Sequence, residues 1–346
     1  MKQLLNTLYI TTPESYLSKD GTNLVVSVDN TEKGRIPIHN IQQVICFGYS
    51  GASPGAMYLC ASNNVTLTFL TANGRYLASV SGETKGNVLL RRTQYRFADD
   101  PDTSLEISKN SIMGKLINCR SILKKGLNNH SDKINAEAVK IGIDHLTSSI
   151  DALNTVSCSG ELRGLEGDAA KNYFKALDEL ILKDKRHFYM KERSRRPPKD
   201  RFNSLLSFLY SMLANDVQSA LESVGLDPYV GFFHTDRPGR PSLALDIMEE
   251  LRPLADRTAL RLVNLGIIDA DGFIEEGGGS YLLTDDARAA IIQAWHDVRY
   301  KDAFHPYIKE TVQSGMIPFV QASLLARYLR GDIDGYPPYI MKPVKQ

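Results

Sequence analysis

Residues 231–253 read GFFHTDRPGRPSLALDIMEELRP, a stretch that combines a histidine with arginines and carboxylates. It begins with apolar residues that lead to His234, and it then crosses a stiff cationic loop that contains Arg237 and Arg240. After Pro241, which suits the first turn of a helix, apolar residues recur at the spacing of one helix face. They are Leu243, Ala244, Ile247, Met248, Leu251 and Leu254. The spacing predicts an amphipathic helix over residues 242–265.

Three carboxylates, those of Asp246, Glu249 and Glu250, lie opposite this apolar arc on the predicted helix. A histidine and carboxylates held near one another by a rigid loop can bind a divalent metal ion. The neighbouring arginines suit an anionic substrate such as a phosphodiester. Spacing alone also allows His234 to be a hydrogen-bonded core histidine and the acids to be a solvated helix face.

The three carboxylates are not expected to be equivalent. Glu250 lies nearest the apolar arc and is predicted to be structural, paired with Arg257 or with another arginine. Glu249 faces away from the arc and is predicted to reach toward His234. Asp246, one turn earlier, is predicted to support a ligand or a metal-bound water.

The bulk composition excludes several classes of protein. The chain has 346 residues, enough for two domains with separate cores, and its net charge of +1 excludes a uniformly basic nucleic-acid coat. Its four cysteines include no CxxC pair, which argues against a zinc ribbon or a disulfide framework and predicts a cytoplasmic protein. No apolar run approaches the ~20 residues of a membrane span.

Residues 1–96 are predicted to form an N-terminal β domain, a small sandwich with one helix near residues 54–62. Short runs rich in β-branched residues are separated by turn pairs such as Asp20-Gly21 and Asn73-Gly74. The predicted strands cover residues 4–10, 24–28, 36–38, 44–47, 65–70 and 76–80.

Composition changes near Phe97, where residues 97–102 are predicted to be a linker. From there the pattern is helical, so residues 103–346 are predicted to form a larger all-α catalytic domain. The fold class is therefore α+β. Residues 267–283 are predicted to be a hairpin or loop pair, and the tail YPPYIMKPVKQ to be extended and mobile. The predicted helices cover residues 103–126, 132–149, 160–182, 200–224, 242–265, 285–297, 303–312 and 316–330.

Positive charge is concentrated in residues 183–201, KDKRHFYMKERSRRPPKDR, which hold nine basic and three acidic residues. Such segregation predicts a site for a polyanion. The interleaved aromatic residues could stack on bases, and the segment is predicted to be an arm that becomes ordered on binding. A solvated loop between helices is the other interpretation of this segment.

A third metal ligand is needed beside His234 and Glu249, and the candidate is Glu166 in SGELRGLEGDAAKNYF, residues 159–174. Gly164 and Gly167 flank it and leave room for a close approach of ligand or backbone. Taken alone, Glu166 could also be an ordinary surface glutamate.

Together these blocks resemble a known family. RGLEGDAAKNYF at residues 163–174, then VGFFHTDRPGRPSLALDIMEELRP at residues 230–253, stand in this order behind an N-terminal β domain. This arrangement is similar to that of the CRISPR-associated adaptation integrases, the "Cas one" endonucleases. The opening LLNTLYITTPESYLSKDGTNLVV, residues 4–26, also resembles members from subtype I-C systems.

The resemblance implies a metal-dependent endonuclease and integrase that inserts foreign DNA fragments into the CRISPR array by transesterification at repeat ends. It implies Glu166, His234 and Glu249 as ligands of Mg²⁺ or Mn²⁺, with Asp246 as a supporting catalytic residue. Expected partners are double-stranded DNA, a second copy paired through the β domain, and a small subunit of the adaptation complex. Residues expected to contact DNA are Lys185, Arg186, Arg193, Arg195, Arg196, Arg237 and Arg240.

Two rival functions stay open from the sequence. One is a stand-alone metal nuclease that acts on branched or single-stranded DNA. The other is a non-catalytic DNA-binding scaffold with a vestigial metal site.

Overall fold

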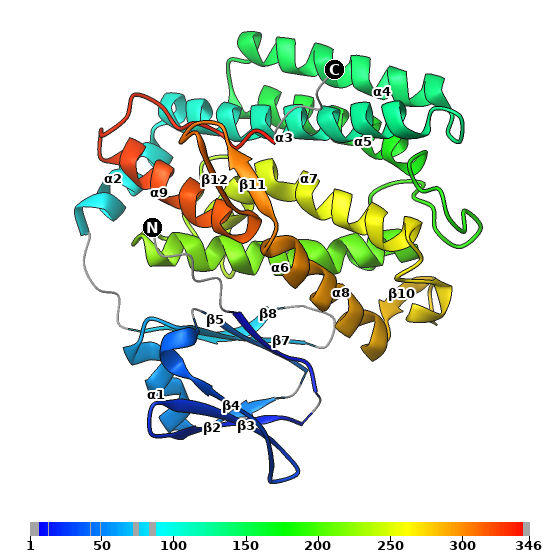
Figure 1. Cartoon of the computed structure of the whole chain (residues 1–346). Coiled ribbons are helices and arrows are strands. Elements are labelled where there is room, and N and C mark those ends of the chain that lie inside the picture. The colour runs from blue at the N-terminus through cyan, green and yellow to red at the C-terminus, as the bar shows by residue number, and fades with distance from the viewer. Residues whose placement is uncertain are drawn as a thin grey trace. The chain divides into compact units, whose positions relative to one another are not determined.

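The computed structural model describes residues 7–12, 14–41, 43–48, 50–71, 76–82 and 88–341. Its chain separates into two compact units, Met1–Gly86 and Asn87–Gln346. The first unit consists mainly of strands and the second mainly of helices (Figure 1). This confirms the predicted α+β fold class.

The second unit carries the candidate site and is built from eight α-helices within its described residues, 88–341. Several of these helices match the predicted ranges within a few residues, because their apolar periodicity is strong. The helices are α2 (Val88–Asp99), α3 (Pro101–His130), α4 (Ala136–Ala152), α5 (Ser159–Asp178), α6 (Arg201–Ser223), α7 (Ser242–Asn264), α8 (Asp285–Arg299) and α9 (Ile317–Leu329).

Helix α7 lies at the centre of this unit, packed between α3 and α6 (Figure 1). It is buried on almost every side, and its acidic residues Asp246, Glu249 and Glu250 are only 2%, 3% and 1% exposed. The alternative interpretation, in which the acidic residues form a solvated helix face, is therefore excluded. Buried carboxylates are stable only with hydrogen bonds or opposite charges, so each of the three must have a specific partner.

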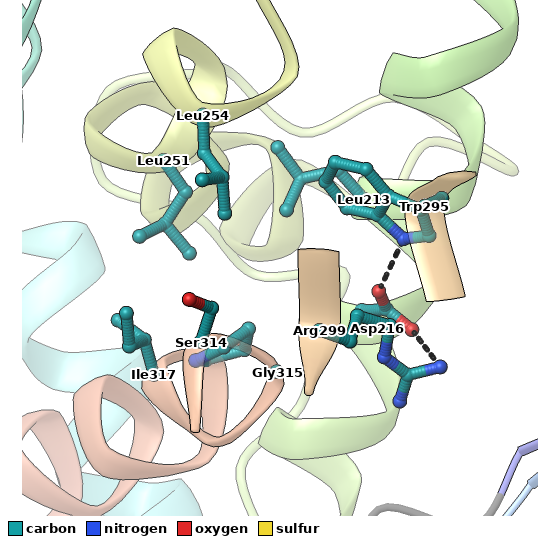
Figure 2. A pocket seen from close by; sticks show the side chains of 10 residues that line it. Leu213, Asp216, Leu251, Leu254, Trp295, Arg299, Ser314, Gly315 and Ile317 are labelled. Carbon is teal, nitrogen blue, oxygen red and sulfur yellow. Dashed lines mark hydrogen bonds and ion pairs between the residues drawn. The ribbon is translucent and has the colours of Figure 1, made fainter. Parts of the chain in front are cut away.

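A further buried carboxylate, Asp216 of α6, lies beside a small cavity on the Leu251 and Leu254 side of α7 (Figure 2). It accepts a hydrogen bond of 3.1 Å from the Trp295 indole and lies 3.7 Å from the Arg299 guanidinium. Burial raises the pKa of Asp216, although Arg299 and Trp295 oppose that effect. The cavity measures about 10 Å³, room for a single water at most. It is a small void in the packed core and is too small to bind a substrate.

Two hairpins interrupt the helical unit, so it is not all-α as predicted. The first, β9 (Phe273–Glu276) with β10 (Ser280–Leu283), confirms the hairpin predicted over residues 267–283. The second, β11 (Asp302–His305) with β12 (Glu310–Gln313), replaces the helix predicted over residues 303–312. That prediction was wrong because a short stretch of sequence does not distinguish the helical repeat of about 3.6 residues from the strand repeat of about two. In addition, Lys309 adopts a positive φ of 55°, which favours a turn.

The C-terminal segment is anchored, which corrects the prediction of a mobile tail for its described part. Tyr336 and Tyr339 are 2% and 5% exposed. Tyr336 Oη donates a hydrogen bond of 2.5 Å to Glu250, and the Tyr339 amide donates one of 2.7 Å to the same carboxylate. Asn118 of α3 accepts a hydrogen bond from the Met341 amide at 2.8 Å. Residues 342–346 lie outside the described range.

We expect Tyr336→Phe to lower the free energy of unfolding by about 1.5–3 kcal/mol, because it removes a buried hydrogen bond to a carboxylate. Thermal or urea denaturation measures this change. Tyr307→Phe is the matched control, since Tyr307 is 46% exposed. Equal stability of the two variants would show that the tail does not stabilise the helical unit.

The N-terminal unit contains two four-stranded sheets and one helix, α1 (Pro54–Ser62), within its described residues. The first sheet has the order β1-β5-β7-β8, with β1–β5 and β5–β7 parallel. The second has the order β4-β3-β2-β6. The strands are β1 (Thr7–Ile10), β2 (Tyr16–Asp20), β3 (Asn23–Val28), β4 (Thr31–Pro37), β5 (Gln43–Phe47), β6 (Gly51–Ala52), β7 (Thr66–Leu70) and β8 (Tyr76–Val80).

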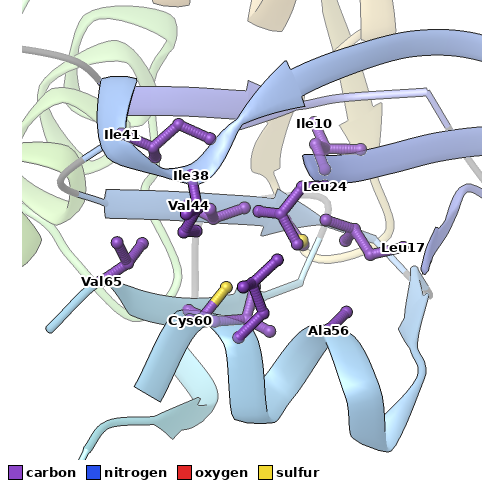
Figure 3. Packing of buried hydrophobic residues seen from close by; sticks show 12 residues of the cluster. Ile10, Leu17, Leu24, Ile38, Ile41, Val44, Ala56, Cys60 and Val65 are labelled. Atoms are coloured by element: carbon purple, nitrogen blue, oxygen red, sulfur yellow. The ribbon is translucent and has the colours of Figure 1, made fainter. Parts of the chain in front are cut away.

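Both sheets and α1 share one core. Figure 3 shows Leu24 of β3, Val44 of β5 and Cys60 of α1 facing the same interior, and all three are fully buried. The predicted helix over residues 54–62 is confirmed, and Ser53 caps it by accepting a hydrogen bond from the Ala56 amide. Strand β2 was missed because its Lys19 and Asp20 have low strand propensity. The predicted turn Asn73-Gly74 and the first residues of the strand predicted over residues 4–10 lie outside the described residues.

The predicted linker, residues 97–102, is a junction between two helices rather than a boundary between units. Helix α2 ends at Asp99, and α3 begins at Pro101 with Asp100 as its cap, accepting a hydrogen bond of 3.1 Å from the Thr103 amide. The boundary between units lies at Gly86 and Asn87, about ten residues earlier than predicted. Acid-and-proline signals mark any helix start, so they could not distinguish a linker from a tight helix junction.

No helix among the described residues has the length and apolar character needed to cross a membrane.

Candidate metal centre

Helix α3 presents a polar stripe to the centre of the helical unit. Its members recur every three or four residues, the spacing of one helix face: Ser104, Ser108, Ser111, Lys115 and Asn118, all buried. Ser104 Oγ donates a hydrogen bond of 2.9 Å to the Phe232 carbonyl, and Asn118 Nδ2 donates one of 2.9 Å to the Glu250 carbonyl. The stripe therefore positions both the segment before His234 and helix α7.

Asp246 holds the segment before α7 in place. Its Oδ2 accepts hydrogen bonds from the amides of Phe232 at 2.6 Å and Phe233 at 2.9 Å, and its Oδ1 accepts one from the His234 amide at 2.9 Å. Gly231 is required for this approach, because a Cβ there would lie 2.8 Å from Asp246 Oδ2. Asp246 is thus saturated by this chain and acts as a positioning residue.

The same carboxylate selects the tautomer of His234. Asp246 Oδ1 lies 2.7 Å from His234 Nδ1. An ionised carboxylate can only accept, so in the neutral imidazole Nδ1 carries the hydrogen and Nε2 keeps its lone pair. That nitrogen lies 4.0 Å from Glu249 Oε1. The predictions that Asp246 supports a ligand and that Glu249 reaches toward His234 agree with this geometry.

Glu249 lies between two cations. Its Oε2 is 2.7 Å from Lys115 Nζ, and its Oε1 is 3.0 Å from an Arg252 guanidinium nitrogen. Burial would raise the pKa of Glu249, but the charges of Arg252 and Lys115 outweigh burial and hold that pKa well below its usual range. Glu249 is therefore ionised throughout the physiological pH range.

Glu166 reaches the same point from α5. Its Oε1 forms an ion pair with Lys115 Nζ, so one ammonium group bridges the carboxylates of α5 and α7. The Glu166 side chain is 20% exposed, compared with 4% for Glu249. The structure thus brings Glu166, His234 and Glu249 together from three distant segments. Lys115 was missed by sequence reasoning, although the polar stripe of α3 is a signal that could have revealed it.

The donor types fit a divalent ion, since two carboxylates and one imidazole suit Mg²⁺ or Mn²⁺. Glu249 Oε2 is buried, and the Lys115 ammonium lies 2.7 Å from it. As they stand, however, no three His, Cys, Asp or Glu side chains of the described residues gather closely enough to hold a metal ion. The Lys115 ammonium lies between Glu166 and Glu249, so a shared metal ion requires it to move.

Glu250 belongs to a different environment, on the side of α7 that contacts the C-terminal segment. It accepts hydrogen bonds from Tyr336, from the Tyr339 amide and from Gln321 Nε2 at 2.8 Å. Burial raises its pKa to about 7, even though these hydrogen bonds oppose the shift. Its predicted structural role agrees with this geometry, but its partners are tyrosines and a glutamine rather than the predicted arginine.

Arginines surround the acidic group. Arg163 of α5 donates a hydrogen bond of 3.2 Å to the Phe233 carbonyl. Desolvation lowers the pKa of Arg240, and the charges of Arg237, Arg163 and Arg195 add to this effect. These four residues, which we call the arginine rim, come from three separate segments. Arg163 was missed by the sequence analysis, although it stands one turn before Glu166.

Two of the predicted DNA contacts in residues 183–201, Arg195 and Arg196, face solvent. Desolvation lowers the pKa of Arg195, whereas the nearby carboxylates Glu249 and Glu166 raise it. Lys185 and Arg186 are also exposed, and Lys185 pairs with Asp178 at 2.7 Å. DNA binding by these residues stays a prediction.

Arg193 is an exception, because its guanidinium serves the fold. It donates hydrogen bonds of 2.6 Å to Asn203 Oδ1 and 3.2 Å to Ser207 Oγ, and it lies 5.2 Å from the Tyr210 ring centroid. Phe188, which was predicted to stack on bases, is 1% exposed and packs edge-on against Phe273. Residues 183–201 are thus anchored at several points rather than forming an arm that awaits a ligand, and Arg193 is withdrawn from the DNA-binding set.

The sequence matches one protein family over most of its length. The family model described as CRISPR associated protein Cas1 matches residues 8–297. The chain belongs to the Cas1 family. A curated relative, CRISPR-associated endonuclease Cas1 2 of Rhodospirillum rubrum, is 47% identical over 350 residues, which cover 99% of this chain and 100% of the relative.

Solved structures share the Cas1 fold at lower identity. A casposase bound to its integration product is 22% identical with a TM-score of 0.84, covering 99% of this chain and 96% of that chain. A Cas6-RT-Cas1–Cas2 complex is 22% identical with a TM-score of 0.83, covering 100% of this chain and 37% of that chain. At these identities the likeness shows the fold alone.

Proposed function

We propose that this Cas1 family member is a metal-dependent DNA integrase that joins captured DNA fragments to the ends of CRISPR repeats. The observation that carries the proposal is the convergence of Glu166, His234 and Glu249, with Asp246 selecting the tautomer that leaves His234 Nε2 available. Named endonucleases among its relatives and the fold shared with a casposase support it.

The reaction is a transesterification. A 3′-hydroxyl of the fragment attacks a phosphodiester at the repeat end; one phosphorus–oxygen bond forms and one breaks, with release of the 3′-hydroxyl of the adjoining nucleotide. Mg²⁺ or Mn²⁺ held by Glu166, His234 and Glu249 would neutralise charge on the phosphoryl oxygens. Asp246 holds the imidazole of His234 in its working orientation. The arginine rim binds the phosphates that flank the reacting one.

Assembly is part of the proposal. We propose that two copies pair through the N-terminal β unit and that dimers associate with a small partner subunit on double-stranded DNA. The fold likeness to a chain of a Cas1–Cas2 complex supports a Cas2-type partner.

Strand transfer tests the function directly. A labelled fragment with free 3′-hydroxyl ends is incubated with a repeat-containing plasmid and Mg²⁺, with and without the partner subunit. Joined products at repeat ends are expected. Nicks without joining would instead indicate the stand-alone nuclease, and DNA binding without either product would indicate the scaffold.

The exposed arginines should contribute sequence-independent affinity. We expect the double variant Arg195→Gln, Arg196→Gln to weaken binding to unrelated duplexes equally and to flatten the salt dependence of log K by up to about 2 units, because each phosphate contact contributes about 0.9. Fluorescence anisotropy across a salt series measures the slope. Lys124→Gln with Lys125→Gln on α3 removes two exposed charges as a control. An unchanged slope in the arginine variant would exclude these residues from DNA binding.

A further inference from the structure

Lys115 occupies an unusual position in the candidate site. Its ammonium group pairs with Glu166 and lies 2.7 Å from Glu249 Oε2, while its side chain is only 8% exposed. These two carboxylates come from α5 and α7, and would repel each other without a cation between them. A lysine is a compact point charge, so it can perform this neutralisation where a metal ion would otherwise sit.

We propose that Lys115 is an internal counter-cation that holds Glu166 and Glu249 together and must be displaced when a divalent metal ion binds them. The inference rests on the proposed metal centre. It accounts for the finding that, among the described residues, the acidic and imidazole groups are near one another but do not close around a common point.

The structure offers a position to which the displaced ammonium can move. Ser111 lies one turn before Lys115 on the same face of α3, and its buried hydroxyl has no hydrogen-bond partner among the described residues. Helical side chains lean toward the N-terminus of their helix, so Lys115 can reach the level of Ser111. The Ser111 hydroxyl would then accept a hydrogen bond from the ammonium.

Charge at the site links metal binding to DNA. The carboxylates of Glu166, Asp246 and Glu249 and the cations of Lys115 and Arg252 leave a formal charge of −1. A divalent ion changes the charge of these five groups to +1, beside the positively charged arginine rim, and a bound phosphodiester compensates that charge. Lys115 therefore lowers the affinity for metal alone and makes metal and DNA bind cooperatively.

The test measures Mn²⁺ binding without DNA, from the electron paramagnetic resonance signal of free Mn²⁺. We expect Lys115→Met to bind Mn²⁺ about tenfold more tightly than the unaltered protein, and to be less heat-stable without Mn²⁺ but restored by it. Lys115→Arg should keep the low affinity, because the charge is retained. Lys124→Met, exposed on the same helix, should change neither property. Equal or weaker Mn²⁺ binding by Lys115→Met would overturn the proposal, as would unfolding that Mn²⁺ does not reverse.

Two further variants complete the design. Ser111→Ala should weaken Mn²⁺ binding when Lys115 is present and should have no effect on it in the Lys115→Met variant. If Ser111→Ala changes Mn²⁺ affinity in neither protein, the proposed movement of Lys115 toward Ser111 is wrong. His234→Ala separates this inference from the proposed function. If Mn²⁺ binds equally with and without His234, the metal centre itself is wrong. If Mn²⁺ binding requires His234 but is unchanged in Lys115→Met, the metal centre is retained and only the proposed role of Lys115 as a counter-cation is wrong.

Discussion

Replacing His234 by alanine is expected to abolish strand transfer while the protein stays folded. Among the described residues, no donor makes a hydrogen bond to Nε2 of His234. Asp246 fixes the imidazole ring so that this nitrogen faces Glu249. A bound metal ion provides several kcal/mol of transition-state stabilisation. Each 1.4 kcal/mol is about tenfold in rate, so we expect a loss of roughly 1,000-fold or more in Mg²⁺.

The fold should tolerate this change. Asp246 keeps its three hydrogen bonds from backbone amides, so the loss in stability should be about 1–2 kcal/mol. His296→Ala provides a matched control, because His296 is a partly exposed histidine of α8 outside the site. Single-turnover strand transfer, with melting curves for both variants, measures the effect. Activity near that of the unaltered protein in a folded His234→Ala variant would show that His234 is not a ligand.

The three acidic residues of α7 should lose activity to different degrees, and Glu249→Gln should be the most severe. Its amide would keep the shape of the side chain but remove the charge that Lys115 and Arg252 surround. Two buried cations would then face a neutral group, so both metal affinity and local order should fall. We expect no detectable strand transfer at saturating Mg²⁺.

Asp246→Asn should be intermediate, with activity reduced by roughly 10–100-fold, the usual cost of losing the partner of a metal-binding histidine. In the variant an NH₂ group replaces one of the two carboxylate oxygens and cannot accept a hydrogen bond from a backbone amide. The segment before His234 should therefore also become less ordered.

Glu250→Gln should keep near-normal activity and lose stability, by about 1–3 kcal/mol, because its donors from Tyr336, Gln321 and Tyr339 would face an amide that accepts less well. Strand transfer and unfolding measured on the three variants in parallel decide the order. An inactive, well-folded Glu250→Gln beside an active Glu249→Gln would contradict the assignment of Glu249 to the metal centre.

Local sequence determined the elements and the family. The helix predicted over residues 242–265 is Ser242–Asn264, because apolar spacing and a proline in the first turn act within the helix itself. The motifs around Glu166 and His234 also indicated the family, and the family model that matches residues 8–297 confirms it. Where local signals were ambiguous, prediction was wrong, as in the hairpin that replaces the helix predicted over residues 303–312.

Only the tertiary structure decided the environments of the polar residues. From the sequence of α7 alone, its charged residues would be expected to face water. In the folded protein α3 and α6 enclose α7, so its acidic residues are buried. Lys115 lies 134 positions before Glu249 in the chain, and no local pattern pairs them. Arg193 looks like its exposed neighbours in sequence, yet its contacts with Asn203 and Tyr210 make it structural. Burial and charge pairing depend on which segments meet in space, so they become visible only once the chain has folded.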